Sequence, residues 1–153
     1  MTDISIVQES PDQPDVLDLL AQSDRLMAEL YPAESNHMLD ISELEKPEVT
    51  FLVARHAGRI VGCAALVAYG DWGEVKRMFV DPSARGLKLG LRLMEALVAQ
   101  GQTLGMTALR LELVAEQPEA MGLYRRFGFT ERGPFGDYVE DPLSIFMEKR
   151  LDG

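Results

Sequence analysis

The sequence predicts an α/β domain built on a mixed, strongly twisted sheet of six or seven strands flanked by four helices. Residues 75–80 are rich in strand formers, and a glycine-containing turn leads from them into a helical pattern at 88–102. Residues 108–114 alternate leucine with charged residues, which is typical of a strand with one buried face, and we expect them beside 75–80. Two apolar runs, 49–56 and 60–68, are separated by a short turn and predict a hairpin.

The remaining elements lie on either side of these central strands. Residues 4–7 predict a first strand, and residues 14–30 predict a helix whose proline lies in the first turn, where a missing N–H is tolerated. A short second helix follows from Ile41. Residues 129–149 predict two strands joined by a long loop.

The composition fits one globular domain. Of the 153 residues, 46% are hydrophobic and 26% charged, so one core can bury about two thirds of the unfolded surface. No run approaches the ~20 apolar residues of a membrane span, and the first residues lack the pattern of a signal peptide. We therefore expect a single domain over residues 1–153, located in the cytoplasm.

The net charge limits the class of partner, and the cysteine content limits the kinds of site that the protein can hold. The formal charge of −10, from 15 basic and 25 acidic residues, argues against DNA or RNA. It suits a cationic or amine substrate, although surface acidity also serves solubility alone. A single cysteine, Cys63, excludes an internal disulfide and a cysteine metal cage; we predict no metal site and a buried, inert thiol.

Residues 85–90 form a candidate anion-binding loop. A glycine loop before a helix leaves backbone N–H groups pointing one way, where the helix dipole favours a phosphate. Gly86 lets the backbone approach an anion, Gly90 allows close packing of the first helical turn, and Arg85 and Lys88 add positive charge. The alternative is a tight turn without a ligand.

This loop and a later helix resemble those of the GCN5-related N-acetyltransferases, the GNAT family. Arg85-Gly86-Leu87-Lys88-Leu89-Gly90 is similar to the family's Arg/Gln-x-x-Gly-x-Gly/Ala pyrophosphate loop, and Leu123-Tyr124 before Phe127-Gly128-Phe129 resembles its tyrosine-bearing helix. The order and separation match, and the resemblance covers nearly the whole chain. One departure is Lys88, which stands where the family has a glycine and changes how the phosphates would be met.

The resemblance implies the GNAT fold, with splayed central strands, and acetyl-CoA as cosubstrate. In that family the pantetheine pairs with the backbone of the central strand, and an N–H near Met78 would polarise the thioester. Gln117 lies about where the family has an asparagine that bonds pantetheine. The implied cofactor-binding residues are Met78, Phe79, Val80, Arg85, Gly86, Leu87, Lys88, Leu89, Gly90 and Gln117.

Two residues carry the implied chemistry. Tyr124 matches the family's tyrosine that protonates the leaving thiolate, with a packing aromatic as the alternative. Glu74 aligns with the general base of some members, acting through water; the alternative is a solvated ion pair with Lys76. Strand alternation predicts that Glu74, Lys76, Met78 and Val80 share one face.

Two segments are expected to form the acceptor pocket. Residues 34–37 and 135–147 resemble a bacterial subgroup of the family, some members of which are labelled as modifying indole-3-acetic acid. That acid offers no amine to acetylate, so the label does not name the acceptor. The candidate acceptor-binding residues are Glu34, Ser35, His37, Asp137 and Tyr138.

The sequence thus predicts an N-acetyltransferase that moves the acetyl group of acetyl-CoA to a primary amine by direct attack on the thioester. The acceptor would be a small amine or a peptide amine, and the assembly a monomer or a homodimer. The alternative from another class is a CoA-binding sensor or interaction module without catalysis. Only the enzyme releases free CoA when it is given an amine.

Overall fold

A computed structural model describes residues 3–30, 41–84, 86–114 and 118–151. Its sheet has seven strands in the order β1-β2-β3-β4-β5-β7-β6, and only the β4–β5 pair is parallel. The strands are β1 (Ile4–Gln8), β2 (Val49–His56), β3 (Arg59–Tyr69), β4 (Trp72–Val80), β5 (Ala108–Val114), β6 (Thr130–Arg132) and β7 (Ser144–Arg150). The helices are α1 (Pro14–Leu30), α2 (Ile41–Leu44), α3 (Leu89–Thr103) and α4 (Pro118–Arg126). The predicted mixed sheet with four helices is confirmed.

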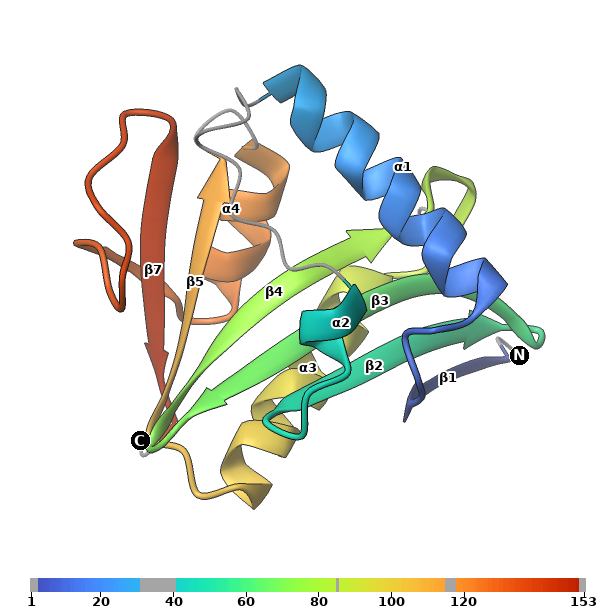
Figure 1. Cartoon of the computed structure of the whole chain (residues 1–153), viewed down its shortest axis with the longest axis horizontal. Helices are drawn as coiled ribbons and strands as arrows, with labels where there is room; N and C mark the ends of the chain where they lie inside the picture. The colour runs from blue at the N-terminus through green and yellow to red at the C-terminus, as the bar shows by residue number, and fades with distance from the viewer. Residues whose placement is uncertain (1–2, 31–40, 85, 115–117, 152–153) are drawn as a thin grey trace.

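Helices cover both faces of the sheet (Figure 1). Buried leucines of α3 and the Tyr124 ring of α4 join one core cluster, whereas Val16, Leu19 and Leu20 of α1 join a second cluster with Leu44 of α2. Each fully buried leucine contributes roughly 1.5–3 kcal/mol, so the two clusters fix which face each strand residue can occupy. We call these sides the α3/α4 face and the α1/α2 face.

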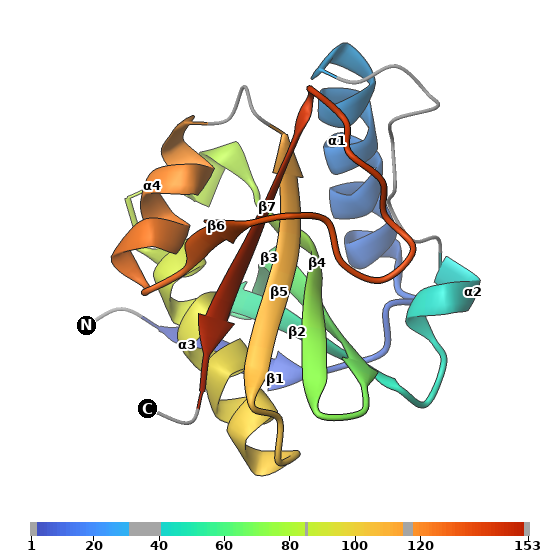
Figure 2. The same cartoon turned by 90° about the vertical axis from the view of Figure 1, so that its left-hand side faces the viewer.

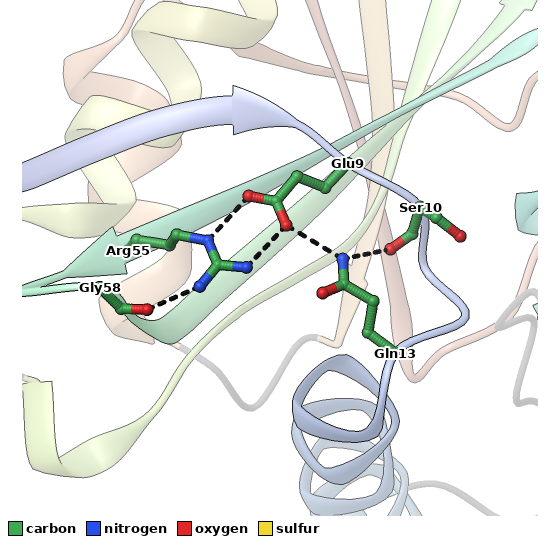
Figure 3. Close-up of polar contacts among 5 residues, drawn as sticks. All are labelled: Glu9, Ser10, Gln13, Arg55 and Gly58. Carbon is green, nitrogen blue, oxygen red and sulfur yellow. Dashed lines mark hydrogen bonds and ion pairs between the residues drawn. The ribbon is translucent and has the colours of Figure 1, made fainter.

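The Glu9 carboxylate links the end of β1 to β2 and to the start of α1 (Figure 3). The Arg55 guanidinium donates two hydrogen bonds of 2.8 Å to Glu9 and one of 2.6 Å to the Gly58 carbonyl. The Gln13 amide donates to Glu9 at 3.0 Å and to the Ser10 carbonyl at 2.8 Å. The Arg55 hydrogen bonds lower the pKa of Glu9 to about 2, so the carboxylate stays ionised and holds these segments together.

The sheet opens between β4 and β5. Their parallel pairing runs from Trp72 opposite Ala108 to Val75 opposite Leu111, and stops there. Both strands continue for several residues beyond this point and diverge (Figure 1). The predicted splay of the central strands is confirmed.

Three findings bear on the remaining expectations. Among the residues that the structure describes, no helix has the length and apolar character needed to cross a membrane. The same residues hold no group of histidine, cysteine, aspartate or glutamate side chains arranged to bind a metal ion. Cys63 is buried, and its burial raises the pKa of the thiol to about 12, which makes it an inert thiol at neutral pH.

Candidate active site

A β-bulge interrupts β4 at the splay. Lys76 lies opposite Ala65 and Phe79 opposite Cys63, so two residues of β4, Arg77 and Met78, face the single Ala64 of β3. The extra residue is Arg77, which has a φ of 55°, in the left-handed region that residues other than glycine rarely occupy.

The bulge reverses the side-chain alternation, so the predicted common face for four residues of β4 is wrong. Lys76 is paired with Ala65, which belongs to the core of the α1/α2 face, and Glu74 lies two residues earlier on that face. Met78 and Val80 instead pack against the core of the α3/α4 face. Side chains of a strand alternate between its two faces, so one inserted residue moves every later side chain to the opposite face.

The backbone of this segment points into the splay. The Asp81 N–H donates to the Val61 carbonyl at 2.8 Å, and the Phe79 N–H contacts the Cys63 sulfur, so both point toward β3. Successive N–H groups of an extended strand point to opposite edges, so those of Met78 and Val80 point toward the β5 edge. That edge is the open one.

The loop before α3 has the shape of an anion cradle. Gly86 has a φ of 92°, and a Cβ added there would meet nothing within 4 Å. Lys88 caps α3 with φ 58° and ψ 36°, and its side chain makes no capping hydrogen bond. Lys88 therefore keeps the left-handed backbone that a glycine adopts without strain.

The loop is continuous with the core, because Leu89 is buried and Leu87 is partly buried against the same cluster. A Cβ added to Gly90 would lie 3.1 Å from the side chain of Leu123 in α4, which shows the predicted close packing of the first helical turn. With room beside Gly86 and the helix N–H groups behind it, the loop fits a pyrophosphate.

Tyr124 of α4 meets β4 from the α3/α4 face. Its hydroxyl donates to the Met78 sulfur at 3.7 Å, and its ring lies 5.7 Å from that of Phe129. Burial raises the pKa of Tyr124 to about 12, so the phenol remains protonated at neutral pH. The ring is both a core residue and a proton-bearing group beside the splay.

Glu74 lies on the other face, within a buried polar cluster. The Tyr138 hydroxyl donates to Glu74 Oε2 at 2.6 Å, and Lys76 Nζ lies 2.6 Å from that hydroxyl and 3.5 Å from Glu74 Oε2. The Glu74 and Lys76 side chains are 5% and 10% exposed, so the expected ion pair exists but is buried rather than solvated. Burial and the Glu74 charge raise the pKa of Tyr138, which keeps its phenol a donor.

Aromatic packing brings Tyr138 to this cluster. The loop between β6 and β7 reaches out toward the side of the sheet where α1 and α2 lie (Figure 2). The Phe135 ring lies 5.2 Å from Tyr138, 5.7 Å from Phe146 and 5.5 Å from Trp72, each in an edge-on arrangement. Phe135 lies in the segment expected at the acceptor pocket, but its packing role was not predicted; an aromatic residue between glycines was the available signal.

The half-exposed Tyr69 ring stacks on Trp72 and lies in the field of several carboxylates. Burial raises the pKa of Tyr69, and the charges of four carboxylates raise it further: Glu74, Asp137, Glu43 and Glu48. We call Glu43, Glu48 and Asp137 the acidic rim. Only Asp137 was predicted from the sequence, because Glu43 and Glu48 come from the distant α2 region. A further acidic residue of the loop, Asp141, instead accepts a hydrogen bond from the Leu143 N–H at 2.8 Å, which closes a local turn.

Some predicted residues lie outside the residues that the structure describes. They are Glu34, Ser35, His37, Arg85 and Gln117. Among the predicted site residues that the structure describes, Tyr124 contacts Met78, and Tyr138 contacts Glu74 and Lys76.

Comparison with known proteins identifies the family. The model of the acetyltransferase (GNAT) family matches residues 14–129. The chain belongs to the GNAT acetyltransferases.

Relatives match along almost the whole chain. An IAA acetyltransferase of Azospirillum brasilense is 50% identical over 153 residues, covering 99% of this chain and 100% of its own length. The uncharacterized N-acetyltransferase YsnE of Bacillus subtilis is 33% identical over 139 residues, covering 89% and 92%.

Two solved structures match the chain over almost its whole length. The putative acyl-CoA N-acyltransferase of Klebsiella pneumoniae is 36% identical, with a TM-score of 0.86 and coverage of 97% and 98% of the two chains. The PaiA N-acetyltransferase of Thermoplasma acidophilum, solved in complex with coenzyme A, has a TM-score of 0.76 at 18% identity, covering 97% and 99%; it supports the fold. The protein is thus an acetyl-CoA-dependent N-acetyltransferase, and the predicted family, fold and cosubstrate are confirmed.

Proposed function

We propose that this acetyltransferase moves the acetyl group to a primary amine by direct attack on the thioester inside the β4–β5 splay. The amine nitrogen forms a bond to the carbonyl carbon, and the carbon–sulfur bond breaks. The amine loses one proton and the departing thiolate gains one. The observation that carries this proposal is the placement of Glu74 on one face of β4 and of Tyr124 against the opposite face, on either side of the point where the β4–β5 pairing ends.

The backbone of the splay would hold the thioester. Because the Met78 N–H points to the open edge, it would donate to the carbonyl oxygen and stabilise the negative charge that develops there. Loss of one such donor costs on the order of 3 kcal/mol of transition-state stabilisation. The loop at residues 86–90 would bind the pyrophosphate, with Lys88 adding charge to the N–H groups of α3.

Glu74 would take the proton from the acceptor, through water. Within the described part of the chain, its hydrogen bond from Tyr138 and its ion pair with Lys76 both use Oε2. Oε1 would face the water. Tyr138 therefore orients the base as well as forming a wall of the acceptor pocket.

Tyr124 would give a proton to the thiolate. Its phenol stays protonated because of burial, and its hydroxyl lies beside Met78, where the sulfur of the cosubstrate would pass. The raised pKa makes Tyr124 a weak acid, so it would act by hydrogen bonding to the developing thiolate before the proton moves. The phenolate would recover its proton from solvent.

The acidic rim favours an amine acceptor that carries at least one further positive or polar group. The charges of Glu43, Glu48 and Asp137 all act on Tyr69. If this surface borders the acceptor site, an ammonium meets a favourable field there and an anion an unfavourable one. The Glu74 charge is already balanced by Lys76 inside the pocket. The rim, rather than the base, would therefore attract the acceptor.

The test is a screen of amines, polyamines, amino acids and peptides, with indole-3-acetate as an anionic arm, read by release of free thiol. We expect thiol release with cationic amines and its loss in Glu74→Gln. Binding of acetyl-CoA without thiol release from any amine would favour a sensor. Faster release with indole-3-acetate than with amines would overturn the proposed acceptor class.

A further inference from the structure

Arg77 is the residue whose backbone forms the bulge, and its side chain is fixed from α1. Its guanidinium donates to the Asp24 carboxylate at 2.7 Å and contacts the Leu20 carbonyl at 3.4 Å. The Arg77 side chain is only 3% exposed, whereas that of Asp24 is 58% exposed. A buried cation on one strand residue is thus tied to a surface carboxylate in the middle of α1.

The backbone of the bulge is held from β3 as well. The Cys63 thiol donates to the Arg77 carbonyl at 3.3 Å, and the Phe79 N–H contacts the same sulfur. One side chain therefore spans the two residues on either side of Met78. We call Arg77, Asp24 and Cys63 the bulge clamp.

The left-handed conformation of Arg77 is costly for a residue with a side chain, and such conformations persist only where surrounding contacts determine them. An asparagine or glycine would adopt it more readily. An arginine at this position indicates that the contacts of its side chain offset the free-energy cost of the left-handed backbone. The peptide plane it controls is the one that joins Arg77 to Met78.

We propose that Arg77 is a positioning residue that, through Asp24, aims the Met78 N–H into the splay. The inference rests on the proposed role of that N–H as the donor to the thioester oxygen. A plane that is not clamped could turn, and an error of about 1 Å in placing a catalytic group can cost on the order of 100-fold in rate. The clamp also links α1, which borders the acceptor side, to the donor that acts on the cosubstrate.

The experiment compares Asp24→Asn with Asp24→Glu, since the Asp24 side chain is exposed and its replacement removes no buried side chain. We expect Asp24→Asn to lower kcat between about 10- and 100-fold, with KM for acetyl-CoA within about twofold of wild type, and Asp24→Glu to restore most of kcat. Arg77→Asn, which suits the left-handed backbone, should behave like Asp24→Asn. Kinetics use thiol release with the best amine of the screen.

Glu9→Gln is the control, because it removes the carboxylate charge from another arginine pair, Glu9 after β1 with Arg55 on β2. Equal falls in kcat for Glu9→Gln and Asp24→Asn would show a general loss of stability and overturn the inference. An unchanged kcat in Asp24→Asn would also overturn it.

A second readout needs no acceptor. Infrared difference spectra of bound acetyl-CoA labelled with ¹³C at the carbonyl report the hydrogen bond to the thioester oxygen. We expect a lowered stretching frequency in wild type and a smaller lowering in Asp24→Asn. The same lowering in both proteins would refute a positioning role for the clamp, whereas no lowering in wild type would refute the proposed role of the Met78 N–H itself.

Discussion

Replacing Lys88 with glycine should separate the effect of its left-handed backbone on stability from the effect of its charge on CoA binding. The free energy of unfolding should rise and the affinity for CoA should fall. The left-handed backbone costs a residue with a side chain roughly 1–2 kcal/mol, and the freedom that glycine gains in the unfolded chain offsets about 0.4–1 kcal/mol. We expect Lys88→Gly to gain about 0.5–1 kcal/mol of stability. For a chain of this size, that raises Tm by about 1–4 °C.

The same substitution should weaken the binding of CoA. An exposed cation beside a phosphate contributes up to about 1 kcal/mol, so we expect the dissociation constant to rise about two- to fivefold. Titration calorimetry at two salt concentrations measures this, since the wild-type affinity should fall more steeply with salt.

Ala57→Gly provides the control for this experiment. Ala57 has a φ of 52° in the exposed turn between β2 and β3, so the substitution relieves the same kind of backbone cost away from the loop. It should raise Tm comparably and leave CoA binding unchanged. A lower Tm for Lys88→Gly would refute the backbone argument, and an unchanged CoA affinity would show that the lysine does not meet the phosphates.

The other predictions concern single contacts. Gly86→Val should weaken CoA binding, measured by calorimetry, because its side chain fills the space beside the loop in a backbone with φ 92°; unchanged affinity in a folded variant would count against the cradle. Tyr124→Phe keeps the ring and should lower kcat about 100-fold with little effect on acetyl-CoA binding, so full activity would leave the ring a packing residue. Asp137→Asn should raise KM for the amine and not for acetyl-CoA. Glu9→Gln should lower Tm at pH 7, where the ionised Glu9 stabilises the folded state. The difference from wild type should vanish as pH falls from about 4.5 to about 2, because Arg55 lowers the pKa of Glu9 to about 2 and protonation of Glu9 removes its contribution to stability.

Much of the fold could be predicted because its signals are local. The strand at residues 75–80, the glycine loop and the following helix are adjacent in sequence, and each depends on its own residues. The alternation at residues 108–114 likewise reports one buried face without knowledge of its neighbours. These segments position the loop before α3, so its place in the fold could be predicted from local signals, whereas the binding of a pyrophosphate there stays a prediction.

The bulge at Arg77 could not be predicted, because nothing in its own sequence requires it. Arginine disfavours a positive φ, and the contacts that hold it come from Asp24 in α1 and Cys63 in β3, 53 and 14 residues away along the chain. The prediction from alternation failed here for that reason. Similarly, the approach of Tyr138 to Glu74 depends on Phe135 packing against aromatic residues of two strands.

The bulge also explains how one strand can serve both an acid and a base. Without the extra residue, Glu74 and the Met78 side chain would lie on the same face, and Tyr124 would approach the strand from the side of the carboxylate. Tyr124 could then hydrogen-bond to Glu74, as Tyr138 does, and the acid and the base would lie on the same side of the sheet. Because the alternation reverses at Arg77, Met78 turns toward Tyr124 while Glu74 stays on the face of the acidic rim. In the proposed reaction the base therefore serves the attacking nitrogen and the acid serves the departing sulfur from opposite sides of the sheet, with the Met78 N–H between them.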